Sequence, residues 1–170
     1  MSRGSTEPDS ACPGETCSDV TPETDATLCP QSRSVGSKVA LVTLKALLSP
    51  SALRRLDGRA YRFCPDSDCE VAYFDSSADS VFRKRDLLIR VGLKETEDPI
   101  PICYCFDVAV ADLRKEIQTQ GTTAIPLMIA AEVRAGHCAC EVRNPQGSCC
   151  LGNVSRALGT IESEVRATAS

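Results

Sequence analysis

Residues 62–74, RFCPDSDCEVAYF, carry the pattern on which the fold of the first half of this chain depends. The aromatic and aliphatic residues on either side of the polar centre predict two strands, residues 61–63 and 70–74, because such side chains are favoured in a sheet. The connecting loop has a thiol at each end, at Cys64 and Cys69. Paired thiols on one short loop are the arrangement that a metal ion requires. The stretch therefore predicts a β-hairpin whose connecting loop contributes two ligands to a metal site.

Cysteine is clustered in the same way along most of the chain. Of its eleven cysteines, all except Cys29 lie in four clusters: Cys12 with Cys17, Cys64 with Cys69, Cys103 with Cys105, and Cys138, Cys140, Cys149 and Cys150 together. An odd number of cysteines does not suit a disulfide framework, and thiols in the cytoplasm stay reduced. The N-terminal residues lack the apolar segment of a signal peptide, which predicts a cytoplasmic location. We therefore expect metal ligation, at more than one centre, rather than disulfides.

Length and composition restrict the classes of protein to consider. The chain has 170 residues, a net charge of −4 and no Trp, so it holds one ordinary domain or two small ones. Small domains with a limited core often gain stability from a bound metal. The acidic charge argues against a general nucleic-acid binder, and no segment approaches the roughly 18 to 20 apolar residues of a membrane span. We therefore expect neither nucleic acid nor a membrane as a partner.

Local composition divides the chain into three predicted parts. Residues 1–35 contain few apolar side chains and are rich in Ser, Thr, Pro, Asp and Glu, so we expect a disordered tail. A β-rich module is expected over residues 36–98, up to a polar linker that contains Pro99 and Pro101. The helical spacing of apolar residues predicts a second, helical module over residues 99–170. The predicted fold class is α+β.

Further elements are expected in both modules. In the first, we predict a strand over residues 39–48, a short helix that begins at Pro50 and is ended by Gly58, and a strand over residues 87–91. Ser49 is expected to cap the short helix. In the second, apolar residues at helical spacing predict three helices: from Val110 to Gly121, from Thr123 to Gly136, and a last one with Leu151, Val154, Leu158, Ile161 and Val165 on one stripe.

Four cysteines of the second module are expected near the starts of helices. Cys103 and Cys105 precede the first of these helices, and Cys149 and Cys150 lie at the start of the last. A helix N-terminus lowers the pKa of a nearby thiol and favours an anionic group. A [2Fe–2S] cluster requires four thiolates, whereas the single His of this chain, His137, does not suit a Rieske centre. We therefore predict an iron–sulfur site.

Three segments resemble a known family: RFCPDSDCEVAYF (62–74), VGLKETEDPIPICYCF (91–106) and CEVRNPQGSCCLGN (140–153). They look like the N-terminal domain of CopZ-type metallochaperones, in which a zinc module precedes a [2Fe–2S] module similar to bacterioferritin-associated ferredoxin. The resemblance covers roughly residues 29–158. It implies that the first module binds zinc and that the second binds the cluster.

The resemblance also implies the ligands of the cluster. The family motif, carried onto this sequence, implies Cys103, Cys105, Cys140 and either Cys149 or Cys150. At about 100° per residue, Cys150 lies close to the apolar stripe of the last helix and Cys149 nearly opposite, so we predict Cys150. Cys138 stays open as an alternative to Cys140.

For zinc, Cys64 and Cys69 resemble one half of the family's site. The other half is normally Cys-Pro-x-Cys, and here the matching run is Cys29-Pro-Gln-Ser32. Three thiolates remain, those of Cys29, Cys64 and Cys69, whereas structural zinc takes four ligands. The fourth ligand is Cys12, Cys17 or water, or else the site is weak or lost.

The resemblance implies one-electron transfer or metal handling, with copper as a candidate cargo and an unidentified redox or metal-transfer protein as partner. Family members that deliver copper carry a further domain with a Met-x-Cys-x-x-Cys loop, and these 170 residues contain no such loop. Because no acid/base pair, nucleophile constellation or phosphate-binding loop is visible, an enzyme is not favoured. Two alternatives remain: a zinc-ribbon-like interaction module without a redox role, and a thiol-based sensor in which Cys149 and Cys150 react or exchange metal.

Overall fold

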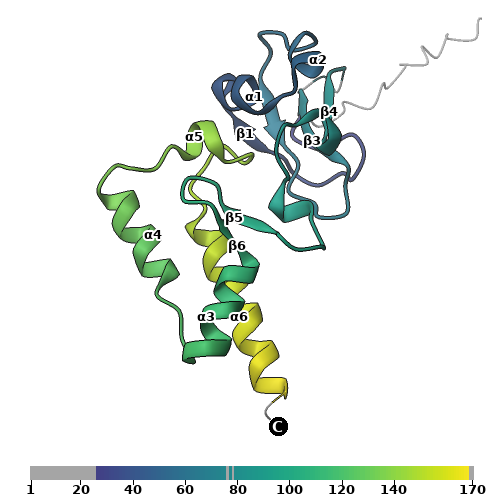
Figure 1. Cartoon of the computed structure of the whole chain (residues 1–170). Coiled ribbons are helices and arrows are strands. Elements are labelled where there is room, and N and C mark those ends of the chain that lie inside the picture. The colour runs from purple at the N-terminus through teal and green to yellow at the C-terminus, as the bar shows by residue number, and fades with distance from the viewer. Residues whose placement is uncertain (1–25, 76, 78, 169–170) are drawn as a thin grey trace, which may run out of the picture.

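The structure is a computed structural model that describes residues 26–75, 77 and 79–168. A four-stranded antiparallel sheet of order β1-β2-β3-β4 occupies one end of the molecule, and three longer helices occupy the other (Figure 1). The sheet consists of β1 (Ser37–Val39), β2 (Tyr61–Phe63), β3 (Val71–Asp75) and β4 (Val81–Arg83). The chain is therefore a mixed α and β protein with a small antiparallel sheet. The combination of helices with an antiparallel sheet agrees with the predicted α+β class.

The hairpin predicted from residues 62–74 is present as β2 and β3. The two strands pair antiparallel, with Phe63 opposite Tyr73. Tyr73 belongs to the main apolar cluster of this end, where its ring lies 6.1 Å from that of Phe63. Phe74 belongs to a second, smaller cluster together with Val71 and three cysteines. Every residue of β3 is consequently buried.

The strand predicted over residues 39–48 is wrong beyond Val39. The chain leaves β1 there and forms helix α1 (Leu41–Leu47), which buries Leu44 and Leu47. Apolar side chains are so dense in this segment that its pattern fits a strand and a helix almost equally. The spacing of Leu41, Leu44 and Leu47 at i, i+3 is what the helix uses.

The strand predicted over residues 87–91 is also wrong. The fourth strand is β4, earlier in the chain, and Leu87 forms only an isolated bridge with Leu48. Leu87 and Val91 are buried in the main cluster. The segment is apolar because it packs against the core, and not because it extends the sheet.

Helix α2 (Pro50–Leu53) begins as predicted. The Ser49 hydroxyl accepts a hydrogen bond from the backbone N–H of Ala52 at 3.3 Å, and proline occupies the first helical position. The helix ends at Leu53, after a single turn, and not at Gly58. The prediction of a disordered tail is wrong for residues 26–35, which form a turn closed by a bridge between Leu28 and Val35.

The three helices predicted for the second half are present as α3 (Val110–Gln120), α4 (Ile125–Arg134) and α6 (Leu151–Thr168). Gly121 ends α3 with a φ of 75°, a value that glycine adopts without strain. Helix α6 packs against α3, α4 and the strand β5 (Pro101–Cys103). Strand β5 pairs with β6 (Val108–Ala109) in a separate two-stranded sheet. The pattern did not predict these two strands, the helix α5 (Cys140–Arg143) or two short 3₁₀ turns, η1 (Lys84–Asp86) and η2 (Gly92–Lys94).

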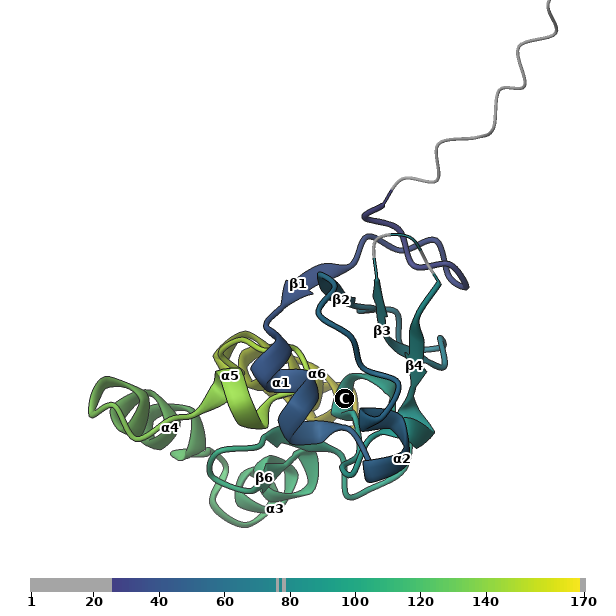
Figure 2. The same cartoon turned by 90° about the horizontal axis from the view of Figure 1, so that it is seen from above.

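The two halves contact each other where α1 lies beside α5 (Figures 1 and 2). The buried Thr43 hydroxyl of α1 donates to the carbonyl of Glu141 at 2.6 Å. The Tyr73 hydroxyl donates to the carbonyl of Pro145 at 2.9 Å, and this contact is also buried. Among the described residues, no helix combines the length and the apolarity that crossing a membrane requires.

The Tyr73 contact gives the first prediction. In Tyr73→Phe the carbonyl of Pro145 stays buried but loses its donor, which costs roughly 1 to 3 kcal/mol. Urea unfolding should therefore show a lower midpoint with an unchanged slope. A variant with the midpoint of the wild type would show that this hydrogen bond does not hold the two halves together.

Candidate metal centres

The first candidate centre lies where the β2–β3 loop meets the turn that precedes β1. Backbone hydrogen bonds shape both segments: Cys29 N–H donates to Ser34 O at 2.9 Å, and Cys64 N–H donates to Ala72 O at 2.9 Å. The N–H of Cys69 donates to the Asp66 carbonyl at 3.4 Å. These turns aim the side chains of Cys29, Cys64 and Cys69 at one point.

The three sulfur atoms of Cys29, Cys64 and Cys69 all lie within 4.8 Å of one another and are buried. No other group of three or more His, Cys, Asp or Glu side chains within the described residues brings its ligand atoms this close. The sulfurs of Cys29 and Cys69 are 3.8 Å apart. Sulfurs that share a tetrahedral zinc ion at about 2.3 Å lie about 3.8 Å apart. The donor set and its spacing therefore fit zinc.

Ser32 lies at the edge of this group, as its place in the matching run suggested. Its hydroxyl oxygen is 3.4 Å from the sulfur of Cys64 and accepts a weak hydrogen bond from Ser34 N–H. A neutral hydroxyl is a poorer zinc ligand than a thiolate. Cys12 and Cys17, the other candidates for the fourth ligand, lie outside the described residues.

Burial and hydrogen bonds shift the pKa values of two thiols of this group in opposite directions. Burial raises the pKa of Cys64 to about 11, although the hydrogen bond with Ser32 and the charge of Lys94 act in the opposite direction. Burial also acts to raise the pKa of Cys29, but hydrogen bonds from Ser32 and Gln31 outweigh it and hold this pKa below its usual value. Zinc binding must therefore displace a proton from Cys64 at neutral pH.

The second candidate centre contains the four cysteines predicted for the cluster: Cys103, Cys105, Cys140 and Cys150. They form two pairs. The sulfurs of Cys105 and Cys140 are 3.7 Å apart, and the side chains of Cys103 and Cys150 lie close enough to shift each other's pKa in opposite directions. The charge of Cys140 acts to raise the pKa of Cys150, and the backbone N–H of Cys150 acts to lower that of Cys140, so the two pairs are neighbours.

Three different elements supply these four thiols. Cys103 ends β5, and Cys105 follows in the β5–β6 turn, so that a short strand separates both from α3. Cys140 is the first residue of α5, and the carbonyl of Cys150 accepts the N–H of Val154 in the first turn of α6. Cys150 points into the helical core, whereas Cys149 is exposed. That difference agrees with the helix phase of the sequence.

Hydrogen bonds also adjust the acidity of the second group. The contact with Cys150 lowers the pKa of Cys103 to about 6, against the effect of burial, and backbone N–H groups of Cys105 and Phe106 lower it further. The same contact raises the pKa of Cys150. Burial raises the pKa of Cys140 to about 12. The N–H of Ala139 donates to the sulfur of Cys105 at 3.2 Å. Cys103 is thus the thiol of this group whose pKa is lowered, and backbone N–H groups donate to the sulfurs of Cys103 and Cys105.

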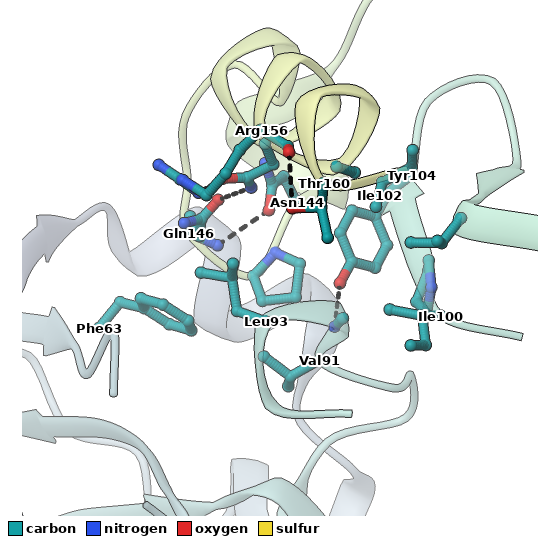
Figure 3. A pocket seen from close by; sticks show the side chains of 16 residues that line it. Phe63, Val91, Leu93, Ile100, Ile102, Tyr104, Asn144, Gln146, Arg156 and Thr160 are labelled. Carbon is teal, nitrogen blue, oxygen red and sulfur yellow. Dashed lines mark hydrogen bonds between the residues drawn. The ribbon is translucent and has the colours of Figure 1, made fainter. Parts of the chain in front are cut away.

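A cavity of about 220 Å³ lies between the two halves, beside the loop that leads to Cys150 (Figure 3). Its walls include Val91, Leu93 and Ile102, and Tyr104, whose hydroxyl accepts the N–H of Gly92 at 2.8 Å. Polar side chains at its rim bond to one another, and no buried side-chain N or O atom in the described residues lacks a partner. Among the described residues, the cavity therefore presents no buried side-chain N or O atom without a partner to a ligand.

Comparisons with known proteins agree with the first centre. Residues 26–88 match the model of a CopZ family described as a zinc binding domain. The copper chaperone CopZ of Archaeoglobus fulgidus is 33% identical over 140 residues, which are 82% of this chain and 65% of the relative. The crystal structure of the N-terminal domain of that protein superposes with a TM-score of 0.62 at 32% identity, covering 76% of this chain and 95% of that domain.

The chain belongs to the family of the CopZ N-terminal domain. Its first half is accordingly a CopZ-type zinc binding domain, in which Cys29, Cys64 and Cys69 form the one tight group of potential ligands among the described residues. The chain spans 65% of the length of the CopZ relative. Sequence reasoning missed two buried polar residues near the centres, Lys94 and Asn144, since a lysine in a polar linker and an Asn-Pro dipeptide both suggest an exposed loop.

The position of Ser32 gives the second prediction. Ser32→Cys adds a thiolate beside the three that are present, so zinc should bind tighter, by about tenfold or more. Competition with a chromophoric chelator measures the dissociation constant. Ser51→Cys, which adds a thiol at an exposed position of α2, is the matched control and should leave the constant unchanged. If Ser32→Cys also leaves it unchanged, Ser32 does not lie at the fourth ligand position.

Proposed function

We propose that this protein carries two metal centres and works in one-electron transfer and metal handling, with copper as its cargo. In this proposal zinc is held by Cys29, Cys64 and Cys69. A [2Fe–2S] cluster is held by the four cysteines of the second centre: Cys103, Cys105, Cys140 and Cys150. The observation that carries the proposal is the arrangement of these four thiols as two adjacent pairs.

The pairing supports a binuclear cluster because four thiolates shared by two irons give two to each. Cys105 and Cys140 would hold one iron, and Cys103 and Cys150 the other. Cys103 is the thiol whose pKa is lowered to about 6. It therefore ionises before Cys150, whose pKa the same contact raises, and is the easier of the two for iron to bind. The backbone N–H of Ala139, directed at the sulfur of Cys105, stabilises negative charge on that thiolate.

Zinc in the first half has a structural role in this proposal, because zinc has no redox chemistry. The ion joins the turn that holds Cys29 to both ends of the β2–β3 loop. The strands of this sheet are only three to five residues long. A bound ion would therefore supply a large part of the cross-linking that the small sheet lacks.

The link to copper comes from the relative, which is named a copper chaperone. A [2Fe–2S] cluster reduced by a redox protein partner would give up one electron, become oxidised, and convert Cu(II) into Cu(I), the ion that thiolates prefer. Cys105 is partly exposed, whereas Cys103 and Cys150 are buried. An electron would therefore enter or leave on the side of the Cys105–Cys140 pair, where a protein partner would dock.

A second candidate function follows from Cys149, which is exposed directly beside the buried Cys150. An exposed thiol next to a second thiol suits metal exchange or redox sensing. In that case the protein would carry no cluster and would be colourless. A zinc module that only binds another protein would also be colourless.

The third prediction separates these functions. Protein purified without oxygen should contain about two irons and two sulfides per chain, and its visible absorption should bleach with dithionite. A colourless protein that takes up no iron on anaerobic reconstitution would contradict the cluster and favour the thiol-based alternatives.

Single substitutions test the ligands of the cluster. Cys103→Ser, Cys105→Ser, Cys140→Ser and Cys150→Ser should each abolish or strongly alter the visible spectrum. Cys149→Ser and Cys138→Ser are the matched controls, because both thiols are neighbours of predicted ligands, and they should preserve it. Loss of the spectrum in Cys149→Ser together with its retention in Cys150→Ser would reverse the assignment.

A further inference from the structure

Lys94, the last residue of η2, is a lysine that is buried beneath the zinc-binding loop. Only 3% of it is exposed. Its ammonium group donates to the carbonyl of Asp66 at 2.5 Å and to that of Cys69 at 3.0 Å. It also lies 5.7 Å from the centre of the Phe63 ring. Both carbonyls belong to the loop that carries Cys64 and Cys69, so Lys94 binds the loop from inside.

The ammonium group of Lys94 has no carboxylate partner among the ion pairs formed by the described residues. The carboxylates next to Cys69 and to Lys94 in the sequence are engaged elsewhere: Glu70 and Glu95 pair with Lys84 at 3.6 and 3.8 Å, and Glu95 also pairs with Arg90 at 2.8 Å. The carboxylate of Asp66 accepts from Ser34 and from the N–H of Asp68. Carbonyl oxygens solvate a buried cation but do not neutralise it, and a buried charge without a counter-charge is strongly unfavourable.

The thiolates of the first centre are the remaining source of negative charge. The Lys94 ammonium group donates to the carbonyl of Cys69 itself, so it lies directly against the loop that carries two of these thiols. Three thiolates and one divalent ion have a net charge of −1, which one ammonium group balances. With Ser32 in place of a fourth thiolate, a single buried lysine is therefore the matching counter-charge for the loaded site.

We propose that Lys94 is a positioning residue of the zinc site, which holds the Cys64–Cys69 loop through two carbonyls and balances the negative charge of the three-thiolate zinc complex. The proposal rests on the zinc site of the proposed function and extends that site. The zinc-binding family model matches residues 26–88 only, so Lys94 lies beyond it. In this proposal the residues that support zinc binding therefore extend past residue 88, into the segment that joins the two halves.

The second half of the molecule holds Lys94 in place. A side chain on Gly92 would lie 1.8 Å from the carbonyl oxygen of Pro101 in β5, so η2 packs directly against that strand. The N–H of Gly92 also donates to the hydroxyl of Tyr104 (Figure 3). In the sequence, Tyr104 stands between Cys103 and Cys105, two predicted cluster ligands. The counter-charge of the first centre is thus positioned by the strand that carries the second.

The next prediction tests the counter-charge in the whole 170-residue chain. Lys94→Met keeps the apolar stem over Phe63 but removes the charge, and Lys94→Gln removes the charge while it keeps an N–H donor. Both should raise the zinc dissociation constant by about 10- to 100-fold, the usual effect of losing a group that supports metal ligands. Lys45→Met removes an exposed lysine from α1. This control should bind zinc like the wild type.

Thermal unfolding with and without zinc completes the experiment. The proposal predicts that both variants lose more stability with zinc bound than without it, so that adding zinc raises their melting temperatures by less than it raises that of the wild type. A wild-type affinity for zinc in either variant would contradict the role of Lys94 as counter-charge. Equal losses of stability with and without zinc would also contradict it, because they indicate a purely structural lysine. A wild-type protein that binds no zinc would instead contradict the zinc site itself.

Discussion

The convergence of three buried thiols on one point is the constraint on which the first half of this protein depends. Cys29 comes from the turn before β1, whereas Cys64 and Cys69 close the β2–β3 loop, and their sulfurs lie within 4.8 Å. Three thiols gain little from such crowding on their own, but the spacing of 3.8 Å between Cys29 and Cys69 suits one shared zinc ion. The short strands around them then need less apolar core to stay folded.

The two halves of the chain are joined through the same region. Lys94 reaches from η2 to the zinc-binding loop, while Gly92 of the same turn packs on β5. The Tyr73–Pro145 contact adds a further connection, between β3 and the loop before α6. Direct contacts therefore connect the two candidate metal centres, although their predicted ligands come from different elements.

Much of this arrangement could be predicted from the sequence, and the failures have physical causes. The hairpin and the three long helices were predicted because their apolar periods are unambiguous, and helix phase placed Cys150 inside and Cys149 outside. Residues 39–48 were assigned to a strand because their dense apolar pattern conceals the helical spacing of α1. The role of Lys94 was not predictable, since only the fold turns a linker lysine toward a buried loop.

Anomalous X-ray scattering from crystals of anaerobically purified protein tests the two-centre account most directly. Data collected on both sides of the zinc and iron absorption edges should give one zinc peak among Cys29, Cys64 and Cys69. They should also give iron density between the Cys105–Cys140 and Cys103–Cys150 pairs. Iron in the three-thiolate site, or no iron between the four thiols of the second half, would contradict the account.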